Sequence, residues 1–408
     1  MTRALSRSPT RLAVRGLTLV ELLVAITIGL VLTLAVTGIV VVSESHRRSM
    51  TAVNDANQSG AYAASVLDLA VRSAGSGFVQ AADQGAFGCQ LSATGELPRA
   101  TPFPAPFTNS FLAGKTSSLR LAPVLIAKNQ SDAGSDVLVV MRGNGAAGDV
   151  PRRITSPGDA VTLKLDATTA FNANDLVLVS RAGTGDCLIE QVASVGTGAL
   201  NLGGPYYTAS GPNTPLSSFA ADLSSYVTPL GNTGSASAPF QLFGVGANNT
   251  LYAYDLPRPT TADESQALAN DVMELHAVYG LDSDGDGRLD SWASPDATGN
   301  PAETAMPGYD IDTVMANPAK MKRIVAVRLA LVLRDTQYEK GDSQSDKGMV
   351  APMTLSYFTD LKNSAGASLA GTTTLATDPT VDVEARHYRY RVVETTIPLR
   401  NMLILTAP

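Results

Sequence analysis

Residues 16–42 read GLTLVELLVAITIGLVLTLAVTGIVVV, and this stretch decides the architecture of the chain. From Leu17 onward it holds 26 residues with one charged side chain, Glu21, and no proline. A helix of that length spans about 39 Å, enough to cross a hydrocarbon core of about 30 Å. The preceding residues 1–16 contain four arginines and no acid. These arginines keep the leader in the cytoplasm, so the carboxyl-terminal side is translocated.

The order of these features differs from that of an ordinary secretory signal. Such a signal has a shorter apolar region and a cleavage site of small residues after it. Here the basic region ends in Gly16, directly before the apolar run. The alternative is an uncleaved signal anchor, but anchoring does not require an intramembrane carboxylate, whose burial in lipid is costly.

The segment 16–26, GLTLVELLVAI, resembles the N-methylation motif of type IV prepilins and of type II secretion pseudopilins. The resemblance implies that prepilin peptidase cuts after Gly16 and that Leu17 becomes the methylated first residue. Glu21 is then the fifth mature residue, which pairs with the amino terminus of a neighbouring subunit during assembly. The alternative is a protonated Glu21 without a role. Leu17 stands where the family usually has Phe, and Gly38 where major pilins usually have proline, so a hinge there is less assured.

Residues 43–74 are expected to continue the helix with one apolar face. Small and apolar residues recur there at spacings of three, four and seven, namely Met50, Val53, Gly60, Ala63, Leu67, Ala70 and Ala74. This pattern predicts an amphipathic half that lies on a sheet. The alternative, a coiled-coil seam, needs stronger apolar residues than these alanines and glycines. Gly75 and Gly77 are expected to end the helix.

The rest of the chain is expected to be rich in strands and loops. Apolar runs bounded by turn residues predict strands at 136–141, 160–165, 175–180, 187–195, 240–245, 250–255, 322–335 and 385–398. The last two are expected to pair with each other, and 240–245 with 250–255. Residues 78–135 and 196–240 are rich in Gly, Pro and Ser and predict mostly loop, whereas 263–279 predicts a helix.

The fold class is therefore α+β, with a long amino-terminal helix packed on an antiparallel sheet and a large β-rich, loop-rich insertion. The expected organisation has four parts: a cleaved leader (1–16), a membrane or filament-core helix (17–42), its amphipathic second half (43–76) and an exported globular domain (77–408).

The layout resembles the PilW-like minor pilins. Besides the methylation motif, the resemblance rests on Gly88-Cys89 soon after the helix, on the stretch 278–290 before VRLALVLR, and on a TTI strand before LRNM at 399–402. It implies a subunit that primes pilus assembly or sits at the tip, with other minor and major pilins and prepilin peptidase as partners. The precursor would lie in the inner membrane with its carboxyl-terminal domain in the periplasm, and the assembled form on the cell-surface pilus. One alternative is a calcium-dependent adhesin or binding module at the pilus tip. Another, which the length of the chain disfavours, is a type II secretion pseudopilin.

The charge of the chain argues against nucleic acid as a partner. Removal of the four leader arginines leaves 26 of 30 basic residues against 37 acidic ones, a balance of −11. Such an acidic surface repels a phosphate backbone.

The chain has two cysteines, Cys89 and Cys187. In an exported protein an isolated pair predicts a disulfide, and the alternative is two buried thiols. The closed loop of about a hundred residues would contribute on the order of 4 kcal/mol in the chain-entropy model.

An acidic stretch, DSDGDGRLD at 282–290, predicts a calcium site. Its residues match positions 1, 3, 5, 7 (by its carbonyl) and 9 of the EF-hand pattern, namely Asp282, Asp284, Asp286, Arg288 and Asp290. The bidentate acid of position 12 is missing, because that residue is Ala293. Asp296, Glu303 or water would have to complete the shell. The alternative is a solvated turn.

No enzyme is predicted. The GNGAAG sequence at 143–148 matches a dinucleotide motif but leads into Pro151 rather than into a helix. The three histidines, His46, His276 and His387, have no metal-ligand spacing, and His276 is expected to be a half-buried packing residue on a helix.

Overall fold

The computed structural model describes residues 18–92, 103–108, 119–132, 134–143, 150–169, 171–208, 213–234, 240–256, 265–339, 350–378 and 383–405. The chain divides into two compact units, residues 1–52 and residues 53–408. One helix, α1 (Leu19–Ser73), begins in the first unit and ends in the second. Gly75 follows it with a φ of 79°, a left-handed conformation that favours glycine, so the predicted helix end is confirmed.

Within the second unit, α1 buries a stripe of mostly small residues: Ala56, Gly60, Ala63, Leu67, Ala70 and Val71. A Cβ atom on Gly60 would lie 2.2 Å from Leu333 Cδ1, so glycine permits the close approach of the helix to the sheet. The predicted amphipathic face is therefore largely correct. Met50, which was expected on it, is 70% exposed because it lies ahead of the second unit.

The buried half of α1 packs against a four-stranded antiparallel sheet. Its strands, in spatial order, are β14 (Ser291–Ala293), β13 (Val272–Leu281), β15 (Ile324–Arg334) and β18 (Tyr390–Pro398). Alternate residues of β15 face opposite sides. Leu331 and Leu333 join the core that includes α1, whereas Val332 joins a small cluster under the hairpin of β16 (Thr354–Tyr357) and β17 (Gly371–Thr374). The predicted pairing of the last two long strands, β15 with β18, is confirmed.

The predicted helix at 263–279 is wrong. In the described part of this stretch the chain forms β12 (Gln266–Ala269) and β13 (Val272–Leu281). Asp271, with a φ of 65°, turns the chain between them. Pairing with β15 along nearly all of β13 supplies main-chain partners that outweigh the local helix propensity of its Glu, Leu and Ala residues.

A second antiparallel sheet has the order β12-β11-β10-β3-β2. Its remaining strands are β11 (Thr250–Asp255), β10 (Phe240–Gly246), β3 (Val137–Met141) and β2 (Val124–Ala127). The pairing of β10 with β11 confirms the predicted hairpin. The strand β2 lies where mostly loop was expected; its four residues are all buried, so tertiary packing rather than length defines it.

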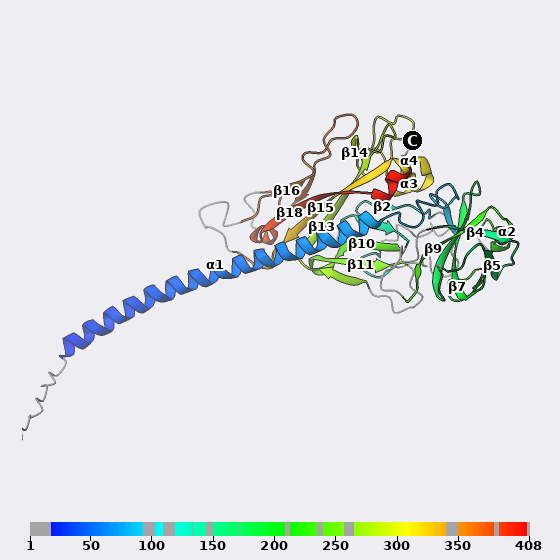
Figure 1. Ribbon diagram of the computed structural model, residues 1–408. Coiled ribbons are helices and arrows are strands. Elements are labelled where there is room, and N and C mark those ends of the chain that lie inside the picture. The colour runs from blue at the N-terminus through cyan, green and yellow to red at the C-terminus, as the bar shows by residue number, and fades with distance from the viewer. Residues whose placement is uncertain are drawn as a thin grey trace, which may run out of the picture. The chain divides into compact units, whose positions relative to one another are not determined.

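Six strands form a closed barrel between β3 and β10, in the order β7-β6-β9-β4-β5-β8, with β8 pairing back to β7. They are β4 (Arg152–Ser156), β5 (Thr162–Leu165), β6 (Asp175–Arg181), β7 (Asp186–Gly196), β8 (Ala199–Leu202) and β9 (Ser225–Asn232). The barrel has a core of its own, to which the helix α2 (Leu216–Ala221) adds Phe219. Figure 1 shows β4, β5, β7, β9 and α2 gathered as one group. The stretch 196–240, expected to be mostly loop, thus contains β8, α2 and β9.

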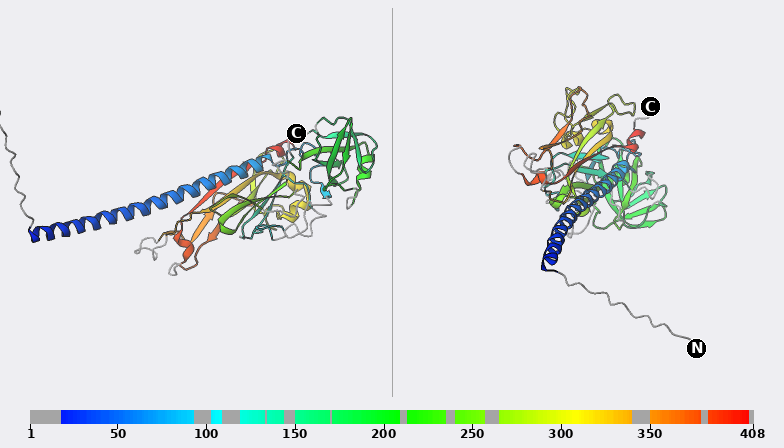
Figure 2. Two further views of the ribbon diagram at one scale, coloured as in Figure 1. Left: turned by 90° about the horizontal axis from the view of Figure 1, so that it is seen from below. Right: turned by 90° about the vertical axis from the view of Figure 1, so that its left-hand side faces the viewer.

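The carboxyl-terminal turn Arg400–Ile404 lies beside the end of α1 (Figure 2), where Asn401 Nδ2 donates to the Ala74 carbonyl at 2.8 Å. Two short helices precede β15: α3 (Ile311–Ala316), capped by the Asp310 carboxylate, and α4 (Pro318–Arg323), capped by the Asn317 side chain.

Candidate functional site

The first turn of α1 positions Glu21. Thr18 precedes the helix, and its Oγ1 accepts a hydrogen bond from the Glu21 amide at 3.3 Å. The Thr18 hydroxyl lies 3.5 Å from Glu21 Oε2 and donates to it. Thr18 and Glu21 therefore resemble a capping box, in which the two side chains satisfy polar groups at a helix start. The predicted cleavage residues Gly16 and Leu17 lie outside the described residues.

The apolar part of α1 is long and apolar enough to cross a membrane. Its polar side chains between residues 22 and 42 are three threonines, and each hydroxyl donates to a carbonyl of the preceding turn: Thr27 to Val24, Thr33 to Gly29, and Thr37 to Thr33 and Leu34. These hydroxyls thus need no water, as a lipid environment requires. The helix continues through Gly38 without interruption.

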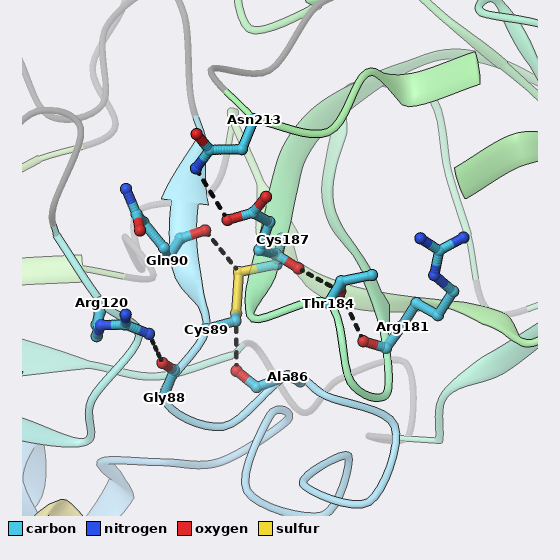
Figure 3. Close-up of a disulfide and its surroundings, with 10 residues drawn as sticks. Ala86, Gly88, Cys89, Gln90, Arg120, Arg181, Thr184, Cys187 and Asn213 are labelled. Atoms are coloured by element: carbon cyan, nitrogen blue, oxygen red, sulfur yellow. Dashed lines mark hydrogen bonds between the residues drawn. A yellow bond between two sulfur atoms is a disulfide. The ribbon is translucent and has the colours of Figure 1, made fainter. Parts of the chain in front are cut away.

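Cys89 and Cys187 form a disulfide in the structure, with Cα atoms 5.7 Å apart. Figure 3 shows the bridge beside β1 (Gln90–Ser92), which pairs in parallel with the start of β7. Both cysteines are buried. The bridge and β1 therefore tie the segment after α1 to the inserted barrel.

The acidic loop after β13 folds around the Asp282 carboxylate. Asp282 is 2% exposed, and its two oxygens accept from the amides of Gly285 at 2.6 Å and Gly287 at 2.7 Å. Both glycines have positive φ, which the tight turn requires. Carboxylate oxygens of Asp282, Asp284 and Asp290 all lie within 4.8 Å of one another. This trio is the one group of His, Cys, Asp and Glu side chains, among the described residues, that could hold a metal ion.

The ligand set differs in detail from the predicted one. Asp286 is not part of the trio, and its Oδ1 accepts from the Arg288 amide at 2.8 Å. Asp296 and Glu303, considered for the missing acid, have other partners. Asp296 pairs with Lys128 at 2.9 Å, and Glu303 pairs with Lys320 at 2.5 Å. The predicted Arg288 carbonyl and water are the remaining sources of further ligands.

Sequence reasoning missed a cluster of ionisable residues at a cavity of about 370 Å³. His276 lies on β13, not on a helix, and its side chain is 13% exposed. Its Nε2 contacts Glu274 Oε2 at 2.8 Å, its Nδ1 lies 3.9 Å from Asp136 Oδ2, and its ring stacks on Tyr357. Glu274 was missed because its strand was expected to be helical.

The pKa values of the two carboxyl groups of the cluster are shifted in opposite directions. Burial raises the pKa of Asp136 above its ordinary value, despite the nearby His276. Burial also acts to raise the pKa of Glu274, but hydrogen bonds from His276 and Thr373 outweigh it and leave that pKa lowered. In the described part of the chain, the side-chain hydrogen bond of His276 is to Glu274 and not to a Ser or Cys side chain.

A single carboxyl group lies inside the barrel. Glu190 alternates along β7 with the core residues Leu188 and Val192 and is fully buried. Its Oε2 accepts from the Thr208 amide at 2.9 Å, and its Oε1 has no hydrogen-bond partner. Burial raises the pKa of Glu190 to about 8. Among the described residues no cation compensates its charge, so we expect Glu190 to make the stability of the fold depend on pH.

Two protein families match the chain. The family described as Type IV Pilus-assembly protein W, PilW, matches residues 242–401, which begin in β10 and end in the carboxyl-terminal turn. The Prokaryotic N-terminal methylation motif matches residues 11–37, which include Glu21. No curated protein and no solved structure matches the chain. The barrel strands lie outside both matched ranges.

Proposed function

We propose that this PilW-like type IV pilin is a minor pilus subunit that prepilin peptidase processes after Gly16 and that then primes assembly or sits at the tip. The observation that carries the proposal is the amino-terminal helix. Its apolar part is exposed, satisfies its own threonine hydroxyls and retains one charged side chain, Glu21. An exposed apolar helix needs lipid or other helices around it. In a pilin the lipid surrounds the helix before assembly, and the helices of other subunits surround it in the filament.

The inserted barrel favours a minor over a main subunit. It adds residues 152–232 to a globular unit that already contains two sheets. Every copy of a main subunit must pack around a shared helical core, so a barrel on each copy would crowd the filament. A subunit present in few copies, near an end of the filament, meets no such constraint.

Glu21 is the residue with the sharpest proposed role, recruitment of the positively charged amino terminus of a neighbouring pilin. The alternative that the geometry suggests is helix capping together with Thr18. Two variants separate these roles. Glu21→Gln keeps an acceptor for the cap but removes the charge, whereas Thr18→Ala removes the cap and keeps the charge.

The proposal is tested on sheared pili and membranes from strains that express these variants. We expect the wild type and Thr18→Ala to enter pili and Glu21→Gln to remain in the membrane, cleaved at the same bond. Mature chains should begin at Leu17 and carry an added methyl group by intact mass. A mature chain that starts elsewhere contradicts the processing, and normal incorporation of Glu21→Gln contradicts the role of its charge. Loss of filaments in a deletion strain supports priming, and normal filaments with lost attachment support adhesion at the tip.

A second candidate function, calcium binding at the acidic loop, is favoured by the trio Asp282, Asp284 and Asp290. Three carboxylates repel one another unless a cation is present, and hard cations such as Ca²⁺ prefer oxygen ligands. With water completing the shell, we expect a dissociation constant of about 10⁻⁴ to 10⁻³ M, the class of extracellular calcium modules.

Calorimetry distinguishes calcium binding from a solvated turn. The wild type should release or absorb heat on calcium addition and melt at a higher temperature than in chelator. Asp284→Asn together with Asp290→Asn should abolish both effects. Asp286→Asn, which lies outside the trio, is the matched control and should keep most of the effect. Identical melting of the wild type in calcium and in chelator would end this proposal.

A further inference from the structure

A buried carboxylate lies at the end of β15, and one of its two oxygens has no hydrogen-bond partner among the described residues. Asp335 directly follows the strand and is 3% exposed. Its Oδ1 accepts from the Arg389 amide at 3.1 Å, and its own amide donates to the Arg389 carbonyl at 3.0 Å. Its Oδ2 has no hydrogen-bond partner. Since a buried charged oxygen without a donor is costly, it points to a group that is supplied from outside.

The nearby cations among the described residues do not fill this need. Arg389 uses its guanidinium on Glu339, with Nε and Nη2 at 2.7 and 2.8 Å from the two carboxylate oxygens. Arg391 donates to Asn57 Oδ1 at 2.6 Å. Burial raises the pKa of Asp335, and the charges of Glu339 and Asp271 add to this effect. The charge of Arg389 acts in the opposite direction, but no cationic side chain among the described residues donates a hydrogen bond to the Asp335 carboxylate.

Asp335 lines a groove of about 240 Å³. The other lining residues come from α1 and from the two strand ends: Val53, Ala56, Asn57, Leu333, Arg389, Tyr390 and Arg391. Aliphatic side chains thus form part of the wall, and one carboxylate oxygen lacks a donor. This combination fits a cation on an aliphatic stem, as in Lys or Arg. A metal ion fits less well, because Asp335 belongs to no group of metal-ligating side chains among the described residues.

We propose that this groove receives a lysine or arginine side chain from the amino-terminal helix of a neighbouring pilin. The inference rests on the proposed function, because a pilus subunit meets other subunits of this helical kind. The groove is walled by α1 itself, so its occupant comes from what packs beside that helix. Helices of this kind can offer the required charge, as Arg47 does in this chain, where it follows the apolar segment and is exposed.

Photo-cross-linking on the full chain in sheared pili tests the proposal. Benzoylphenylalanine in place of Val53, at the groove wall, should capture a peptide from the amino-terminal helix of another pilin, and that peptide should contain Lys or Arg. Asp335→Asn keeps an acceptor for the Arg389 amide and removes the charge. It should lower the cross-link yield at least about tenfold, since loss of one partner of a buried charge pair costs several kcal/mol.

Two controls keep the result interpretable. Benzoylphenylalanine at Asn54, one position on and absent from the groove, should not give this cross-link. Asp136→Asn, which also alters a buried carboxylate but far along the sequence and outside the groove, should leave the yield unchanged. Equal yields with Asp335→Asn, or a captured peptide from anything other than a pilin helix, would overturn the inference. If the wild type is absent from pili, the proposed function is wrong, but the groove can still be tested. The Val53 cross-link is then measured in membranes, where its loss in Asp335→Asn supports the inference and an equal yield contradicts it.

Discussion

The barrel should lose stability as the pH rises, and Glu190→Gln should abolish this loss. Glu190 is fully buried between core residues of β7, and its pKa is raised from 4.5 to about 8. Between these pH values the folded state retains a proton that the unfolded state has released. The free energy of unfolding therefore decreases as the pH rises through this window. The decrease begins near pH 4.5 and is complete above pH 8.

The size of the effect follows from the width of the window. Each pH unit contributes about 1.4 kcal/mol, so stability at pH 7 should be about 3 kcal/mol lower than at pH 4.5. Glutamine has the shape of the protonated acid, keeps an acceptor for the Thr208 amide and does not ionise. The Glu190→Gln variant should therefore match the wild type near pH 4.5 and exceed it by about 3 kcal/mol at pH 7.

Urea unfolding, followed by circular dichroism at several pH values between 4.5 and 8, measures this difference. Only the difference between variant and wild type is used, because other carboxyl groups also titrate in the folded state. Asp296 and Glu303, for example, have lowered pKa values. Asp166→Asn, which changes an exposed carboxylate next to β5, is the matched control. If the difference between Glu190→Gln and the wild type is constant across this range, the buried, uncompensated state of Glu190 is refuted.

Two further predictions concern stability at other points of the globular unit. Replacing Cys89 and Cys187 together by alanine should lower the free energy of unfolding by about 5 kcal/mol in the chain-entropy model, because their separation of 98 residues makes a long loop. Urea unfolding measures the loss, and non-reducing peptide mapping should find the two wild-type peptides joined. Glu303→Gln should cost about 3 kcal/mol, since it leaves the Lys320 ammonium buried at 4% exposure without its counter-charge. The exposed pair of Arg48 with Glu44 is its control, and Glu44→Gln should change thermal stability by less than about 1 kcal/mol.

The sequence was most informative where a pattern is local and long. The end of α1 at a glycine and the strand at 322–335, observed as Ile324–Arg334, follow from composition and apolar alternation. The helix expected at 263–279 fails because its residues have helix propensity while their pairing partner lies some fifty residues away in β15. A local signal was present: Asn270-Asp271 is a turn dipeptide, and Asp271 adopts positive φ.

The barrel was harder to predict because its decisive features are non-local. β9 contains Pro229, which argues against a strand in the sequence. In the structure Pro229 pairs with Val177 where the register with β6 shifts, so the irregularity accommodates it. The barrel closes where the short strand β8 pairs with the long strand β7. The hydrophobic periodicity of the sequence does not predict this pairing.

The candidate sites divide in the same way. The acidic loop was located from residue type and spacing, yet the structure groups Asp290 rather than Asp286 with Asp282 and Asp284. A turn with two glycines at positive φ sets which carboxylates converge, and spacing alone does not fix that geometry. No sequence pattern marks Asp335. It is of interest because it is buried and because Arg389, the neighbouring cation, pairs with Glu339 rather than with Asp335.

The position of the barrel explains how one chain can combine a family body with an added module. β3 and β10 are neighbours in one sheet, and Met141 pairs with Phe240. The chain therefore leaves and re-enters the sheet at one place, where an insertion of any length leaves the sheet pairing intact. The matched PilW range begins at residue 242, after the barrel. What must be retained is the connection between the sheets and the barrel: the disulfide and the pairing of β1 with β7 limit the freedom of a module that two chain crossings alone would leave loosely attached.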